Sequence, residues 1–346
     1  MSADISRNAA GQAEVFVAGA PAWHHLGVNV KEAQTWGKAS KLAGLDWTIS
    51  KNQLVNPRTG LPIPSYALLR DDDNRWIHTV GEGYNPIQNK DTFTFVDALL
   101  ESGDAHYESA GALGNGEIVW CLARLKKDFS PVAGDAHHTY LLFAEFRDGR
   151  AAQVKLTMTR VVCQNTLNVA LSQRKIGDNV LRIRHSGDID TKIKAAKSLV
   201  SNVNGDITKI NNKLAELAKK QITVSSFSIV MEKLFPGWEK GGRAQNKAAA
   251  VAMNFENNDG GNIPKIAGTA YSLLQSVTKF IDHQRDGLRT GGKAEDLPRA
   301  RAESAMFGTG DVFKSEALDR ICEAVGVSTF SEDEQRVDKI AGMVAF

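Results

Sequence analysis

The sequence predicts an α+β protein: a mostly antiparallel sheet with packed helices, followed by a helical C-terminal half with one long heptad-patterned helix. Three observations predict this class. Strand-like segments follow one another through the first half with short connections, which favour antiparallel pairing. After Asp188 the apolar residues change to helical spacing. Apolar residues make up 42% of the 346-residue chain, which is enough for a substantial core.

In the first half, turn-forming residues separate short apolar or alternating segments. Helices are predicted over residues 31–45, where Gly44 supplies a stop signal, and over 90–102. The predicted strands cover residues 46–55, 65–71, 75–81, 106–113, 117–125, 139–146 and 151–162. In the last of these, apolar residues alternate with Lys155, Thr157 and Thr159, so we expect one face in the core and the other toward water or a ligand.

The stretch "TRVVCQNTLNVAL" crowds a cation and amide side chains between two apolar runs. It predicts a helix over residues 165–173 that Asn165 caps, because asparagine accepts hydrogen bonds from free N–H groups at a helix start. A short strand over 179–185 follows. Arg160 has two interpretations that stay open: it faces an anionic ligand, or it forms a structural ion pair.

From Asp188 to Lys220, apolar residues recur in alternating steps of four and three, which is a heptad pattern. Its positions are Ile189, Ile193, Ala196, Val200, Val203, Ile207, Ile210, Leu214 and Leu217. Such a narrow stripe requires a partner helix, either in the same chain or in another subunit. We assign all of these residues except Ala196 to oligomerisation.

Further helices are predicted over residues 223–234, 242–254, 266–284 and 314–325. The expected domain organisation is a sheet domain at 21–187 and a helical region at 188–330, with the long helix at 188–220. Residues 1–20 and 331–346 are expected to be flexible ends.

No motif for nucleotide hydrolysis or covalent catalysis occurs in the chain. The sequence lacks GxxxxGK[ST] and GxSxG, and its adjacent histidine pairs lack the spacing of metal ligands. The three cysteines lie far apart without CxxC spacing. We therefore expect no catalytic residues, no metal and no cofactor, and a binding protein rather than an enzyme.

Charge is the strongest remaining signal. Residues 150–220 contain 14 lysines and arginines but 5 acidic residues, a net charge of +9, whereas the whole chain has a net charge of +2. This excess indicates an anion-binding surface, although the solvated face of a long helix would also explain it. The predicted nucleic-acid-binding residues are Lys155, Arg160, Gln164, Asn165, Arg174, Lys175, Arg182, Arg184, Lys192, Lys194 and Lys197.

Single-stranded nucleic acid also requires aromatic stacking platforms. Four aromatic residues lie on or beside predicted strands: Trp76, Tyr84, Trp120 and Tyr140. Each is either such a platform or part of the core.

Several motifs resemble those of one family in order along nearly the whole chain. They are "PAWHHLGVNV", "GEGYNPIQNKDTFTFVDALLESG", "YESAGALGNGEIVWCLARL", "RVVCQNTLNVAL", "GTAYSLLQSVTKFIDH" and "MFGTGDVFKSEALD". The chain thus resembles the phage/plasmid-like protein family, a numbered domain of unknown function. The resemblance implies a mobile-element protein in the cytoplasm of a bacterial host. The strand and helix order at 46–102 is also similar in outline to phage single-strand annealing proteins.

Two hypotheses from different classes follow. The first is a protein that binds single-stranded DNA and anneals it in recombination or replication, as a homo-oligomer and without breaking bonds. The second is a protein-binding factor, such as a host-defence antagonist or an assembly protein, that acts through the heptad helix. An enzyme that processes nucleic acid is a third possibility. No apolar run is long enough to span a membrane, so no membrane partner is expected.

Overall fold

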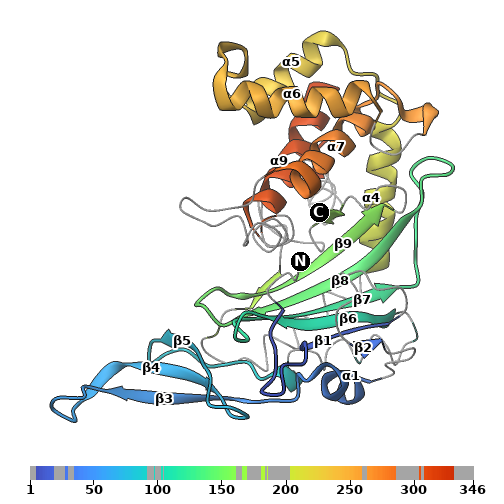
Figure 1. Ribbon diagram of the computed structural model, residues 1–346. Coiled ribbons are helices and arrows are strands. Elements are labelled where there is room, and N and C mark those ends of the chain that lie inside the picture. The colour runs from blue at the N-terminus through green and yellow to red at the C-terminus, as the bar shows by residue number, and fades with distance from the viewer. Residues whose placement is uncertain are drawn as a thin grey trace, which may run out of the picture. The chain divides into compact units, whose positions relative to one another are not determined.

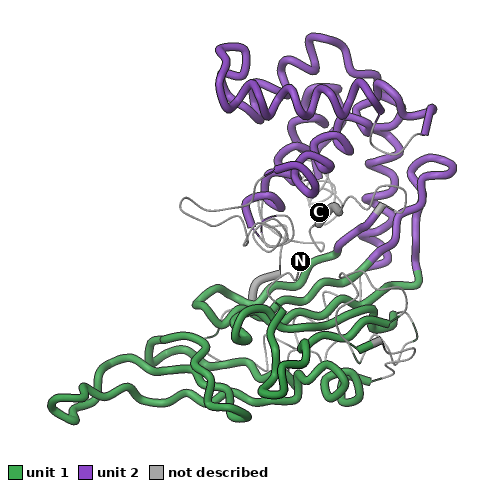
Figure 2. Tube along the Cα trace, viewed as in Figure 1, with its two compact units in different colours: residues 1–126, 140–156, 180–202 green, residues 127–139, 157–179, 203–346 purple. Residues whose placement is uncertain are grey.

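The structure is a computed structural model (Figure 1) that describes residues 5–18, 28–29, 35–91, 97, 103, 105–160, 166–169, 181–183, 185, 203–258, 263–285, 304 and 308–330. It has the predicted α+β class. The chain forms two compact units that interleave in sequence (Figure 2). Unit 1 comprises residues 1–126, 140–156 and 180–202, and unit 2 comprises residues 127–139, 157–179 and 203–346. The predicted division at residues 187 and 188 is sequential and lacks this interleaving.

The larger sheet has eight strands in the order β10-β9-β8-β7-β6-β1-β2, with β11 also paired to β9. Pairing is antiparallel between β6, β7 and β8, and parallel between β1 and β2. The strands are β1 (Val15–Val17), β2 (Val28–Asn29), β6 (Ala105–Leu113), β7 (Ile118–Leu125), β8 (His137–Phe146), β9 (Ala152–Arg160), β10 (Thr166–Val169) and β11 (Leu181–Ile183). The central strands β6, β7 and β8 are apolar and almost completely buried, as expected for strands that are covered on both faces.

A second, three-stranded antiparallel sheet in unit 1 has the order β3-β4-β5. Its strands are β3 (Ile49–Val55), β4 (Pro62–Arg70) and β5 (Trp76–Val80). All three lie within two or three residues of their predicted ranges. Helix α1 (Trp36–Ala43) precedes this sheet and ends where Gly44 adopts a left-handed conformation with φ of 66°, as its sequence predicts.

Unit 2 contains the helices of the C-terminal half. These are α4 (Val203–Leu217), α5 (Val224–Leu234), α6 (Gly242–Glu256), α7 (Ala270–Lys279) and α9 (Thr309–Ala324), with short helices at Trp238–Lys240, Pro264–Ile266 and Phe280–Gln284. Helix α7 is buried along nearly its whole length, and α4, α6 and α9 pack against it. Thr223 and Thr269 cap α5 and α7 by accepting hydrogen bonds from Ser226 and Ser272. No helix in the described ranges has the length and apolar character needed to cross a membrane.

Three local predictions are wrong. The segment predicted as helix 165–173 contains strand β10 at Thr166–Val169, so the proposed capping role of Asn165 has no helix there to act on. Its short apolar run fits either period, and pairing with β9 selects the strand. Residues 152–158 of β9 are buried on both faces rather than one, so the alternation of polar and apolar residues along this strand does not mark a solvated face. The N-terminal segment is not a flexible end throughout, since β1 is buried against β6.

A buried ion pair links the two sheets of unit 1. Arg70, at the end of β4, is completely buried, and its Nη1 and Nη2 donate to the Glu14 carboxylate at 2.8 and 2.5 Å. The same guanidinium donates to Asp72 and lies 4.2 Å over the ring of Trp47. Burial disfavours the charged form, but the bonds to Glu14 and Asp72 outweigh it and raise the pKa of Arg70 above its usual value.

Replacing Glu14 with glutamine should destabilise unit 1 by about 3 kcal/mol, because Arg70 loses its buried carboxylate partner and keeps only the partly exposed Asp72. The measurement is urea unfolding followed by tryptophan fluorescence, which reports mainly on unit 1 since only Trp238 lies in unit 2. The matched control is Glu82→Gln, an exposed glutamate of unit 1, which should cost about 1 kcal/mol or less. Equal shifts for the two variants would contradict this role for Glu14.

Candidate nucleic-acid interface

The described ranges include few of the predicted basic side chains. Lys155 is 1% exposed, so this residue is removed from the predicted surface: it lies on a strand that is buried on both faces. Arg160 and Arg182 lie on β9 and β11, and their side chains are outside the described part. The remaining predicted residues lie outside the described ranges: Gln164, Asn165, Arg174, Lys175, Arg184, Lys192, Lys194 and Lys197.

The backbone of β9 and β11 gives two of these arginines a position. Arg182 lies opposite Gln153 in unit 1, whereas Arg160 ends β9 in unit 2.

The described half of the heptad stripe is buried inside unit 2. Val203, Ile207, Ile210, Leu214 and Leu217 are each at most 5% exposed on α4. These five residues therefore find their apolar partners within the chain and are not available for the oligomerisation that the sequence predicts. Ile189, Ile193 and Val200 lie outside the described ranges.

One face of the three-stranded sheet instead combines aromatic rings with a cation. Lys51 on β3, Leu68 on β4 and His78 on β5 form one row across the sheet. Tyr66 lies two residues before Leu68, so its ring belongs to the same face of the sheet. The register shifts at Trp76, which pairs with Leu69, but its ring still lies beside that of His78. We call Lys51, Tyr66, Trp76 and His78 the stacking face.

The rings of the stacking face are at least partly accessible, and contacts within the face hold them in place. Trp76 is 51% exposed, which is unusual for a tryptophan, and its ring centroid lies 6.2 Å from that of His78. The Nζ of Lys51 lies 4.4 Å from the ring centroid of Tyr66, within the range of a cation–π contact. Tyr66 and His78 are half-buried. The face thus offers flat apolar surfaces beside a positive charge.

Lys51 is held in place by the loop that follows β5. Its Nζ donates to the backbone carbonyls of Glu82 and Tyr84 at 2.5 and 3.0 Å. Neither acceptor is charged, so the ammonium group keeps its net charge. A lysine anchored through carbonyls needs little further ordering when it meets an anion.

Acidic residues are absent from the sequence of β3, β4 and their turn. No aspartate or glutamate occurs between Asp46 and Asp71, whereas this stretch contains Lys51, Arg58 and Arg70. Acids do occur in the turn to β5, where Asp72 pairs with the buried Arg70 and Asp73 pairs with Arg75. Lys51 and Arg58 are thus the cations that β3, β4 and their turn offer to an approaching anion.

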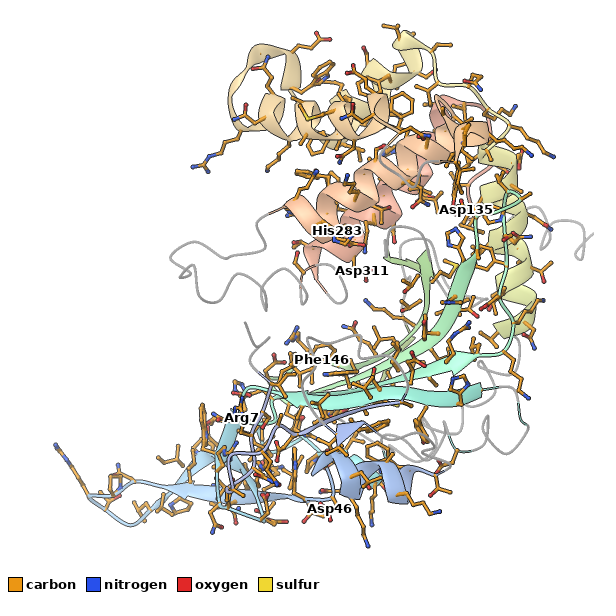
Figure 3. The ribbon with its side chains drawn as sticks, turned by 45° about the vertical axis from the view of Figure 1, so that its right-hand side comes forward. Arg7, Asp46, Asp135, Phe146, His283 and Asp311 are labelled. Atoms are coloured by element: carbon orange, nitrogen blue, oxygen red, sulfur yellow. The ribbon has the colours of Figure 1, made fainter. Side chains whose placement is uncertain are left out.

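A cluster of buried polar groups lies beneath the Tyr84 loop. The Tyr84 ring stacks on the His185 ring with centroids 4.6 Å apart. The Nε2 of His185 is 3.4 Å from an oxygen of Glu145, which precedes Phe146 (labelled in Figure 3) on β8. The Glu145 carboxyl is completely buried, and neither of its oxygens has a hydrogen-bond partner in the described structure.

Burial sets the protonation of this cluster. It raises the pKa of Glu145 to about 8, against a smaller lowering by Arg147, and it lowers the pKa of His185 to about 4. Between these values both side chains are neutral.

Arg147 connects this cluster to the ion pair of Arg70. Its guanidinium donates to the Gly116 carbonyl and to Asn89, and lies 4.9 Å over the ring of Trp47. Trp47 therefore contacts two buried arginines. Gly116 has φ of 100°, and a Cβ atom there would lie 2.8 Å from the Trp47 ring, so only glycine fits.

Other polar groupings among the described residues are less suited to a ligand. In unit 2, Tyr271 donates to Asp135 (labelled in Figure 3) and contacts Nε2 of His137, but all three side chains are buried. A cavity of about 330 Å³ beside α1 is lined by residues such as Asn8 and Gln12, whose amides bond to each other. No group of three metal-ligating side chains is found in the described ranges.

The sequence identified one residue of the stacking face, Trp76, as a possible platform. Of the other three candidates, Trp120 and Tyr140 are core residues. Tyr84 contributes only its backbone carbonyl, which accepts a hydrogen bond from Lys51. Lys51, Tyr66 and His78 were missed because their charge and ring character are ordinary. The signal that could have found them is the acid-free stretch across two predicted strands.

The chain belongs to a family described as Domain of unknown function (DUF932), whose model matches residues 77–306. The match begins within β5 and runs through the helices of unit 2 as far as the residues before α9. No significant match is found among curated proteins or among solved structures.

Glu145→Gln should change how stability depends on pH. Because folding raises the pKa of Glu145, the wild type loses the corresponding stability as pH rises from about 4.5 to about 8. His185, whose pKa folding lowers, acts oppositely between about 4 and 6.5. From pH 6.5 to 8 the wild type should therefore lose about 1 kcal/mol per pH unit, whereas the variant should stay level.

The measurement is urea unfolding by tryptophan fluorescence at several pH values. The matched control is Glu82→Gln, an exposed glutamate of unit 1, which should follow the wild-type profile. Parallel profiles for wild type and Glu145→Gln would show that this carboxyl is ionised in the fold.

Proposed function

We propose that this member of the DUF932 family is a nucleic-acid-binding protein of a phage or plasmid, which binds single-stranded DNA and anneals it without breaking bonds. The observation that carries the proposal is the stacking face, on which an exposed tryptophan and two further rings lie beside an anchored lysine. Recombination or replication of a mobile element is the setting in which such annealing is needed.

The arrangement fits single strands better than duplexes. Every base has a π-face that can stack on an aromatic side chain, but only an unpaired strand exposes those faces. Trp76 and His78 offer neighbouring rings, and Lys51 adds charge at the edge. Recognition by stacking does not depend on the base, which suits a protein that must bind any sequence.

Phosphate binding supplies the second part of the proposed interaction. The net positive charge at 150–220 provides cations for the backbone of the strand, although Lys155 and Lys213 are buried and do not contribute. Arg160 and Arg182, on strands of the larger sheet, are the proposed phosphate-binding residues with a defined backbone position. In this proposal several copies of the chain act along one strand.

Trp76→Ala should weaken binding to a labelled single strand of about 40 nucleotides by roughly 5- to 100-fold, because one base then has no ring to stack on. Fluorescence anisotropy across a salt series measures the affinity. The slope against salt should stay unchanged, because no charge is removed. Trp76→Phe is the matched control and should retain most of the affinity. Absence of binding by the wild-type protein at low salt would overturn the proposed function.

A second variant replaces five basic residues with alanine and should change the salt dependence as well as the affinity. The residues are Arg160, Arg174, Lys175, Arg182 and Arg184. Removing one phosphate-binding cation reduces the salt slope for a single strand by about 0.7, so both affinity and slope should fall. The same anisotropy series checks this outcome. Wild-type affinity and slope in the variant would remove these residues from the interface, while leaving the stacking face to be judged by its own variant.

A further inference from the structure

The hairpin of β3 and β4 extends past the third strand of its sheet (Figure 1). Strand β5 pairs with β4 only from Tyr66 to Leu69, whereas β3 and β4 remain paired as far as Val55 and Pro62. Residues 53–64 therefore form a two-stranded arm with a turn at its end. An isolated two-stranded hairpin is only marginally stable in water, so an exposed arm of this kind needs a source of rigidity.

The end of the arm exposes apolar side chains. Leu61 is 65% exposed, Val55 is 55% exposed, and Pro57, Pro62 and Pro64 are also at the surface. The charged residue at the end is Arg58, which is exposed and has no acidic residue near it in sequence. An apolar tip with a cation has the chemistry of a surface that enters a base stack beside phosphates.

Local hydrogen bonds hold this tip in one conformation. Asn56 and Leu61 are joined by a backbone bond of 2.8 Å, and the Asn56 side chain accepts from the backbone N–H of Arg58. Gly60 closes the turn with φ of 69°, which favours glycine. Further along, the amide of Gln53 donates across the ribbon to the Ile63 carbonyl. Leu61 is thus presented by a preorganised turn.

The prolines argue against a partner that adds a strand to the β4 edge of the arm. Pro62 and Pro64 lack the N–H groups that a neighbouring strand would need. With these prolines, the end of the arm is better suited to contact a partner than its β4 edge is. A nucleic acid complements both features of the tip, because it offers phosphates to Arg58 and apolar base faces to Leu61.

We propose that the tip of this arm is a wedge that inserts Leu61 and Pro62 between adjacent bases at a junction of single-stranded and double-stranded DNA, with Arg58 against the flanking phosphate. This inference rests on the proposed function and adds a duplex end to its ligand. Insertion of apolar side chains into a base step costs unstacking energy, which the added interactions offset. The wedge would separate or capture strands where annealing proceeds.

The test uses a DNA junction with 2-aminopurine next to the duplex end, whose fluorescence rises when the base unstacks. Wild-type protein at saturation should raise the fluorescence severalfold. Leu61→Ser should lose most of that rise while binding the plain single strand within about twofold of wild type, because Leu61 is an exposed residue that folding does not need. Val224→Ser, which is 86% exposed in unit 2, is the matched control and should behave as wild type.

The two proposals fail in distinguishable ways. If wild-type protein binds the single strand but leaves 2-aminopurine stacked at every position tested, the wedge is overturned and the proposed function stands. An equal rise with Leu61→Ser also overturns the wedge. If wild-type protein binds neither DNA, the proposed function is overturned and the wedge with it.

Discussion

The buried contact of Arg70 with Glu14 is the interaction on which the arrangement of unit 1 depends. One partner closes β4 of the small sheet and the other precedes β1 of the large sheet, so the pair joins two sheets that share no strand. A charge buried in this way is stable only while its partners remain, and Arg70 has a second carboxylate in Asp72 and the face of Trp47. The ribbon and its stacking face are therefore fixed at their root by this ion pair together with buried apolar residues such as Leu68 and Ile77.

Trp47 extends that constraint to the polar groups beneath the stacking face. Arg147 shares its ring with Arg70 and also bonds to Asn89, which in turn donates to the carbonyls of Leu45 and Trp47. Near Arg147, burial keeps Glu145 protonated and His185 neutral, and Tyr84 stacks on that histidine. Since the carbonyl of Tyr84 holds Lys51, a chain of contacts runs from the buried cluster to the cation at the surface.

The sequence predicted the fold better than the site, for physical reasons. Strands β3 to β8 were located closely because turn residues and apolar runs define them locally. Helix 165–173 was wrong because a short apolar run fits both periods, and only pairing with β9 decides. Lys155 was wrongly predicted to be exposed because alternation along β9 suggests one solvated face, whereas both faces of this strand are buried. Trp76 and Trp120 look alike in sequence, yet the first lies on a small edge sheet and the second in the middle of the large one.

Exposure of apolar side chains has a cost that the ribbon limits by its own composition. A flat, exposed, apolar two-stranded arm invites pairing with other chains. Here the prolines of β4 remove donors from one edge of the arm. At the base of the ribbon, the amide of Gln88 bonds to the backbone of Ile49, and Lys51 adds charge to β3. A ribbon with a protected β4 edge and an apolar end is suited to a partner that contributes stacking surfaces and negative charge.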